Sequence, residues 1–173
     1  MTKKALLLID VLNSFDFSHG DVLANKTTAM IPTILKLKQS FYERNEPIIY
    51  INDHYNLWEA DIKRIVQEIS NPTSKPIIDS LFPDKNDYFL IKPKHSAFYG
   101  TALQTLLHQL HVTNLVLAGI AGNICVLFTA NDAYMREFPL HVPENAIASV
   151  SDDDQIYALR MMKNVLKADT TKF

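Results

Sequence analysis

Short runs of apolar residues alternate along the chain with longer stretches in which apolar residues recur every three or four positions. The short runs are typical of strands buried on both faces, and the longer stretches are typical of amphipathic helices. The predicted strands are Ala5–Ile9, Pro47–Asn52, Tyr88–Ile91, Asn114–Ala118 and Leu140–Val142. The predicted helices are Ile31–Arg44, Ile62–Ile69, Thr101–Leu110, Asn123–Arg136 and Asp152–Lys167. Strands that alternate with helices pair in parallel through right-handed crossovers. We therefore expect an α/β fold, a three-layer αβα sandwich around a central, mostly parallel sheet.

Local signals refine the boundaries of these elements. Pro32 is expected near the start of the first helix, because proline is favoured in the first helical turn. Asn71–Pro76 carries two prolines and is interpreted as a long surface loop. Ser151 or Asp152 is expected to cap the last helix. Since the chain has no internal repeat and no Gly/Ser linker, we expect one domain over residues 1–173.

Composition narrows the class of protein. Of 173 residues, 47% are hydrophobic and 21% are charged, which favours a packed globular domain over a disordered chain. Lys and Arg number 17 against 19 Asp and Glu, so a net charge of −2 predicts no nucleic-acid or membrane partner. One cysteine, Cys125, excludes an intramolecular disulfide and favours a reducing compartment. Together with the absence of a signal-peptide pattern or an apolar run of membrane-spanning length, this predicts a cytoplasmic location.

Polar residues follow three of the predicted strands. Asp10 ends the first, Lys92 follows the third, and Gly119–Cys125 follows the fourth. Sites in parallel α/β sheets form beyond the carboxyl ends of the strands. These three segments are therefore the candidates for a site.

The chemistry of these side chains is complementary. Cys125 is expected in the first turn of a helix, where unpaired N–H groups and the helix dipole lower the pKa of a thiol and stabilise an oxyanion. Each residue also has a structural interpretation. Cys125 alone is equally consistent with a small buried core residue, Asp10 with a helix cap, and Lys92 with a surface lysine. The coincidence of all three at strand ends favours a functional site.

Three blocks of sequence carry a resemblance to a known family. They are Leu7–Phe15, Lys92–Leu103 with its Ser96-Ala97-Phe98, and Gly119–Tyr134 with its Gly-Ile-Ala-Gly-Asn-Ile-Cys-Val. On these blocks the chain resembles the isochorismatase-like cysteine hydrolases, which include nicotinamidases and N-carbamoylsarcosine amidases. The match covers nearly the whole chain and implies an isochorismatase-like, Rossmann-like topology. It also implies a homo-oligomer that acts on a small-molecule substrate.

The resemblance implies an Asp–Lys–Cys triad formed by Asp10, Lys92 and Cys125. It selects Lys92 over Lys94, because the family's lysine opens the block that contains Ser-Ala-Phe. In this interpretation Asp10 takes the thiol proton and later passes it to the leaving amine. Lys92 keeps Asp10 ionised and favours the thiolate. Attack on an amide then gives an acyl-thioester that water hydrolyses.

Other features of the site also follow from the resemblance. The family's cis non-proline peptide corresponds to Ile120-Ala121, where it would aim the Ala121 N–H at the oxyanion. Many relatives have Thr where this chain has Gly122, so this position lacks a hydroxyl. Aromatic side chains are expected to line an apolar pocket beside the triad, namely Phe15, Trp58 and Phe98.

A metal site is not expected. Nicotinamidases bind a metal through an Asp-x-His pair and a further His, whereas here Asp53 and His54 are adjacent and Tyr55 takes the third position. Adjacent residues at a strand end point to opposite faces, which is poor geometry for one ion. We therefore predict neither a metal nor another cofactor.

The sequence thus predicts a cysteine hydrolase that cleaves the C–N bond of a small amide. Two alternatives of different kinds remain open. One is an isochorismatase-type ether hydrolase, whose chemistry needs an acidic group but no thiol. The other is a non-catalytic binding module with the same fold. Redox sensing through the sole thiol is a further, separate possibility.

Overall fold

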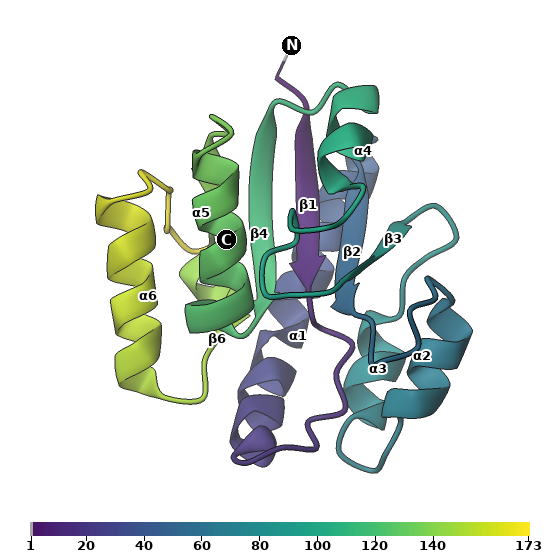
Figure 1. Cartoon of the computed structure of the whole chain (residues 1–173). Coiled ribbons are helices and arrows are strands. Elements are labelled where there is room, and N and C mark those ends of the chain that lie inside the picture. The colour runs from purple at the N-terminus through teal and green to yellow at the C-terminus, as the bar shows by residue number, and fades with distance from the viewer. Residues whose placement is uncertain (1) are drawn as a thin grey trace.

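A six-stranded sheet forms the middle layer of the molecule (Figure 1). The structure is a computed structural model and describes residues 2–173. The strands are β1 (Lys4–Ile9), β2 (Ile48–Asp53), β3 (Tyr88–Lys92), β4 (Asn114–Ile120), β5 (Leu140–His141) and β6 (Ile147–Ala148). Their order in the sheet is β3-β2-β1-β4-β5. Strand β6 pairs with the same edge of β4 as β5 does, but nearer the carboxyl end of β4. Every described pair of strands is parallel, which confirms the predicted fold class.

Helices cover both faces of this sheet. One face packs against α1 (Gly20–Glu43), α2 (Ile62–Ile69) and α3 (Lys75–Leu81), and the other packs against α4 (Leu103–Gln109), α5 (Leu127–Tyr134) and α6 (Asp152–Asn164). The division follows from the two-residue period of a strand: Leu6 and Leu8 face the first cluster, and Leu7 and Ile9 face the second. Within residues 2–173, no helix has the length and apolar character needed to cross a membrane.

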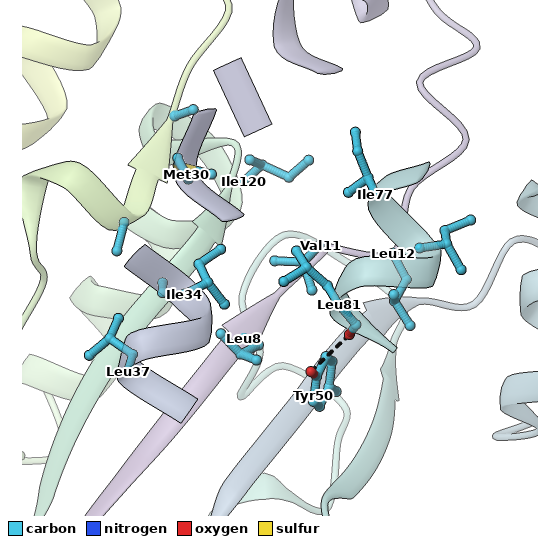
Figure 2. Close-up of a cluster of buried hydrophobic side chains, with 14 of the residues drawn as sticks. Leu8, Val11, Leu12, Met30, Ile34, Leu37, Tyr50, Ile77, Leu81 and Ile120 are labelled. Atoms are coloured by element: carbon cyan, nitrogen blue, oxygen red, sulfur yellow. Dashed lines mark hydrogen bonds between the residues drawn. The ribbon is translucent and has the colours of Figure 1, made fainter. Parts of the chain in front are cut away.

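The core on the α1–α3 face is closely packed around β1 and β2 (Figure 2). Leu8, Ile34 and Tyr50 are fully buried there, and burying each such side chain contributes about 1.5–3 kcal/mol to folding. The Tyr50 hydroxyl is the polar exception in this cluster. It donates to the Leu81 carbonyl oxygen at 2.8 Å, which ties α3 to the centre of the sheet.

The prediction for the first helix is wrong at its start. Helix α1 begins at Gly20, eleven residues before the predicted Ile31, and Pro32 lies in its interior. Toward the amino end of α1, the residues that face the core include small or polar ones such as Ala24 and Thr27. The helical spacing of strongly apolar residues is therefore not visible there. Pro32 is exposed, on the side of the helix away from the core.

Two other local predictions need correction, and one short strand was not predicted. The segment 71–76 is not a long loop, because α3 begins at Lys75 with Pro76 in its first turn. Strand β6 lacks any predicted counterpart, since two residues are too few to show a period. The helix predicted from Asn123 is divided into a π-helical turn, η1 (Gly122–Val126), and α5. The predicted cap is confirmed, because the Ser151 side chain accepts a hydrogen bond from the Asp154 N–H.

Candidate active site

Three strand ends bring Asp10, Lys92 and Cys125 together at the carboxyl edge of the sheet. Asp10 follows β1, Lys92 is the last residue of β3, and Cys125 lies in η1 immediately after β4. The Lys92 Nζ is 2.8 Å from Asp10 Oδ2 and 3.5 Å from Cys125 Sγ. Strand β2 lies between β1 and β3, so its last residue, Asp53, belongs to the same edge.

Lys92 is the centre of this group. Its side chain is 2% exposed, and a buried ammonium is costly unless each N–H finds a partner. Besides Asp10 and Cys125, the Nζ donates to the Lys94 carbonyl oxygen at 3.1 Å, which gives its three N–H bonds three acceptors. Lys94 itself is exposed. The lysine beside the carboxylate is therefore Lys92, in agreement with the choice made from the Ser-Ala-Phe block.

Asp10 is held from two sides. Its Oδ1 accepts the Asp53 backbone N–H at 2.9 Å, and its Oδ2 faces the Lys92 ammonium. Burial raises the pKa of the Asp10 carboxyl above its ordinary value, while the charge of Lys92 acts in the opposite direction. The result is a desolvated carboxylate with an increased affinity for a proton, next to a thiol that carries one.

The thiol of Cys125 differs from the expectation. Burial, the largest cause, and the Asp10 carboxylate together raise the pKa of Cys125 to about 12, although the Lys92 ammonium acts to lower it. The predicted lowering is wrong, because the thiol is desolvated and a carboxylate lies near it. Cys125 also lies in η1 and not in the first turn of α5. At neutral pH the site therefore holds a neutral thiol near the Asp10 carboxylate.

Backbone geometry brings β4 and the cysteine turn close to β1. Gly119 has a φ of 125°, and a Cβ there would lie 2.1 Å from the Ile9 carbonyl oxygen. Only glycine permits this approach. Shortly after Gly119, the peptide bond between Ile120 and Ala121 is cis, as the family resemblance implies. The Ala121 carbonyl oxygen then accepts the N–H groups of Ile124 and Val126 at 3.0 and 3.2 Å, which closes the turn around Cys125.

The Ser-Ala-Phe block connects the lysine loop to the cysteine helix. The Ala97 N–H donates to Thr129 Oγ1 at 3.0 Å, and Ser96 Oγ donates to Asp132 Oδ2 at 2.5 Å. Thr129 and Asp132 both lie on α5, which continues directly from η1. These two bonds fix the loop after Lys92 against the element that carries Cys125.

A cavity of about 390 Å³ opens beside the three side chains. Its lining includes Asp10, Lys92 and Cys125, together with polar and aromatic groups from the neighbouring loops, among them Asn13, Phe17, Asp53, Tyr55 and His95. The predicted aromatic lining is wrong. Phe15 and Phe98 are buried in the two hydrophobic clusters, one on each face of the sheet. Trp58 is 67% exposed and stacks on His54, and none of the three borders the cavity.

His95 is a neighbour of the thiol that sequence reasoning missed. Its Nδ1 lies 4.0 Å from Cys125 Sγ, and its ring lies 5.5 Å from that of Phe128. The only sequence signal for it was its place three residues after Lys92. The imidazole lies beside the sulfur at the cavity lining.

The donor set at the end of β2 does not fit a metal ion. His54 is buried, its Nδ1 accepts the Asn56 N–H at 3.0 Å, and its ring stacks on Trp58, so it is absent from the cavity lining that includes Asp53. Tyr55 directs its hydroxyl to the Leu12 carbonyl oxygen at 3.1 Å. Within residues 2–173, no group of three or more His, Cys, Asp or Glu side chains is placed to hold a metal ion.

Comparisons with known proteins agree with this architecture. Residues 4–171 match the family model described as the isochorismatase domain. The chain belongs to the isochorismatase family. It is 58% identical over 168 residues to the isochorismatase family protein YaaI of Bacillus subtilis, and the match covers 97% of this chain and 93% of YaaI.

Solved structures of other members of the isochorismatase family have the same fold. The crystal structure of nicotinamidase PncA from Bacillus subtilis superposes with a TM-score of 0.77 at 30% identity, covering 99% of this chain and all of that one. The N-carbamoylsarcosine amidase from Thermoplasma acidophilum superposes with a TM-score of 0.76 at 26% identity, covering 99% and 96% of the two chains. The three-layer arrangement of Figure 1 is therefore that of the isochorismatase family.

Proposed function

We propose that this protein is a cytoplasmic cysteine hydrolase that cleaves the C–N bond of a small amide. The observation that carries the proposal is one buried ammonium, that of Lys92, which contacts both the buried Asp10 carboxylate and the Cys125 thiol. Membership of the isochorismatase family and the similarity to a nicotinamidase and an N-carbamoylsarcosine amidase support an amide as the substrate.

The reaction begins with a proton transfer from Cys125 to Asp10. Because burial raises the pKa of both groups, the thiol gives up its proton only as the sulfur begins to bond to carbon. The Lys92 ammonium, 3.5 Å from the sulfur, stabilises the negative charge that develops there. The Sγ–C bond forms and the carbonyl π electrons move to oxygen, which gives a tetrahedral oxyanion.

The oxyanion requires donors on the far side of the carbonyl. In this proposal they are the backbone N–H groups of Ala121 and Cys125, at the turn that follows β4. Removing one such donor from an acyl-transfer site typically costs about 10²–10³ in rate. Asp10 then returns its proton to the nitrogen, the C–N bond breaks, and the amine or ammonia leaves the acyl-thioester on Cys125.

Hydrolysis of the acyl-enzyme repeats the sequence with water. Asp10 takes a proton from the attacking water, the C–O bond forms, and the thiolate leaves as the Sγ–C bond breaks. The proton on Asp10 passes back to the sulfur, which restores the resting site and releases a carboxylic acid. One water is consumed, and the carboxylate–ammonium pair has the same charge at the end as at the beginning.

A panel of small amides tests the proposal. It contains nicotinamide and N-carbamoylsarcosine, the substrates in the names of the two structural relatives, together with simple carboxamides. We expect ammonia release from at least one of them, and a loss of activity of about 10³-fold or more in Cys125→Ser and Asp10→Asn. Intact-mass measurement should detect an acyl adduct on Cys125 in the wild type.

The alternatives give different results in the same experiment. An ether hydrolase would release no ammonia from the panel but would cleave a small enol ether, and it would keep that activity in Cys125→Ser and lose it in Asp10→Asn. A binding module would neither release ammonia nor form an acyl adduct with p-nitrophenyl acetate, an activated acyl donor. Either result would overturn the amidase proposal.

A further inference from the structure

A buried serine and a glutamine hold the turn that carries Cys125. Ser149 Oγ accepts the backbone N–H of Asn123 at 3.1 Å and donates to Gln155 Oε1 at 2.7 Å. Gln155 Nε2 in turn donates to the Ile147 carbonyl oxygen at 3.0 Å. Ser149 is 1% exposed and follows β6, while Gln155 lies in the first turn of α6. The three bonds therefore connect η1 to both β6 and α6.

Gly122 fits against this pair. A Cβ at position 122 would lie 2.6 Å from Gln155 Oε1 and 3.0 Å from Ser149 Oγ. The backbone of Gly122 does not need the left-handed conformation, so space and not φ requires a glycine here. The two polar side chains occupy the volume that a side chain at position 122 would fill.

The main chain of this segment has a separate anchor. Lys26 on α1 donates to the carbonyl oxygens of Ser149 and Val150 at 3.1 and 3.0 Å, and it forms an ion pair with Asp152. Ser149 is therefore held in place whether or not its hydroxyl is present. Its hydroxyl is available to orient a neighbour, and that neighbour is the amide two residues before Cys125.

We propose that Ser149 and Gln155 are positioning residues that set the direction of the Cys125 backbone N–H toward the substrate's carbonyl oxygen. This proposal rests on the cysteine hydrolase function proposed above. Consecutive N–H groups in one helical turn point the same way, so fixing the Asn123 N–H fixes the plane of the turn that contains the Cys125 N–H. Oxyanion donors act only when they are oriented before the reaction, and small displacements reduce the rate severely.

Two reactions of the same thiol separate this role from general structural support. Acylation by p-nitrophenyl acetate passes through a tetrahedral oxyanion as the sulfur displaces p-nitrophenolate. Alkylation by iodoacetamide displaces iodide at a saturated carbon and forms no oxyanion. In Ser149→Ala, acylation should be slower by about tenfold or more, while alkylation changes by less than twofold. Ser149→Thr, which keeps the hydroxyl, should retain most of the acylation rate.

A second pair of variants tests the fit between Gly122 and Gln155. Gly122→Ala forces the glutamine amide away from Ser149, and Gln155→Ala removes it. Both variants disturb the same hydrogen-bond chain, so the double variant should acylate no more slowly than the slower of the two single variants. Fully additive losses would contradict a shared role.

The matched control is Ser74→Ala. Ser74 is also buried, with an Oγ that accepts the Asn71 N–H at 2.9 Å and donates to the Ile69 carbonyl oxygen at 2.8 Å, but it lies on the α1–α3 face. It should lower stability without changing either reaction. If Ser149→Ala leaves acylation unchanged, or slows both reactions equally, the positioning role is wrong. If the wild type is never acylated, the hydrolase proposal fails first, and the two failures are distinguishable.

Discussion

The Lys92 ammonium lies 2.8 Å from the Asp10 carboxylate, and the two side chains are 2% and 8% exposed. Neither charge would be stable there alone, because removing an ion from water costs several kcal/mol. Burial acts to lower the pKa of Lys92, but the acidic surroundings, above all the Asp10 carboxylate, raise it above its ordinary value. The pair therefore stays charged as a unit, and the thiol responds to both members.

Removing one member should be far more costly than removing both. Lys92→Met leaves Asp10 desolvated and unpaired, and we expect it to reduce the free energy of unfolding by about 3–5 kcal/mol. In the double variant Asp10→Leu/Lys92→Met no buried charge is left without a partner, so most of this loss should be recovered. Urea unfolding at neutral pH measures both values.

The exposed ion pair of α3 is the control for this cycle. Lys75 and Asp79 are 3.0 Å apart but are 67% and 61% exposed, so Lys75→Met should cost no more than about 1 kcal/mol. A loss in Lys92→Met as small as that in Lys75→Met would contradict the conclusion that burial makes the Asp10–Lys92 pair interdependent.

Asp10→Asn should separate the reactivity of the thiol from catalysis. The Asp10 charge raises the pKa of Cys125, so neutralising it lowers that pKa and increases the thiolate fraction near pH 8. Alkylation by iodoacetamide at pH 8 should therefore become faster than in the wild type. Amide hydrolysis should fall by about 10³-fold or more, because the group that moves the proton is missing.

The control for this variant is Asp16→Asn, which neutralises an exposed carboxylate of the same loop. It should leave both rates within about twofold of the wild type. Alkylation profiles should be recorded from pH 6 to pH 11, where the wild-type rate is expected to keep rising because the thiol pKa is about 12. A wild-type plateau below pH 9 would show that burial does not dominate this thiol.

The thiol should also make stability depend on alkaline pH. Its ordinary pKa of 9.0 applies to the unfolded chain, and the folded value is about 12. As pH rises from about 9 to about 12, the unfolded state loses this proton while the folded state keeps it, so the free energy of unfolding falls. Each pKa unit corresponds to about 1.4 kcal/mol, which limits the loss to about 4 kcal/mol.

Variants without the thiol isolate this contribution from those of the lysines and tyrosines. Cys125→Ala and Cys125→Ser should show a shallower decline of unfolding free energy between pH 9 and pH 11 than the wild type does. Unfolding by urea at several pH values gives the comparison. Parallel curves for the wild type and both variants would mean that the folded thiol titrates as it does in the unfolded chain.

The sequence predicted the strands and the meeting of Asp10, Lys92 and Cys125 because both depend on local patterns. A run such as Ala5–Ile9 is apolar throughout because it is covered on both faces, and parallel strands bring their carboxyl ends to one edge. The start of α1 was missed because Ala24 and Thr27 face the core without being strongly apolar.

Features of the site that depend on contacts distant in sequence were not predictable. The raised pKa of Cys125 follows from its burial and from Asp10, which lies 115 residues away. The space that excludes a side chain at Gly122 is filled by Ser149 and Gln155 from another element. Phe15 and Phe98 belong to the same sequence blocks as Asp10 and Lys92. Their side chains nevertheless pack into the hydrophobic core and not into the site.

Tyr50 offers a test of the core that is separate from the chemistry. Its hydroxyl donates to the Leu81 carbonyl oxygen at 2.8 Å and accepts from Lys38 Nζ at 2.9 Å, and its side chain is fully buried (Figure 2). Tyr50→Phe keeps the ring but leaves the Leu81 carbonyl oxygen without this donor. An unsatisfied buried polar group typically costs about 1–3 kcal/mol, so we expect a loss of unfolding free energy of that size.

The matched control is Tyr88→Phe on β3, whose side chain is 38% exposed, and its cost should stay below about 0.5 kcal/mol. Lys38 keeps Asp84 and Asp87 as partners at 3.2 and 3.3 Å, so no buried charge is stranded in Tyr50→Phe. Acylation of Cys125 by p-nitrophenyl acetate should therefore remain within twofold of the wild type while the urea midpoint falls. A loss of acylation that parallels the loss of stability would instead mean that the α1–α3 core and the cysteine site are coupled through the sheet.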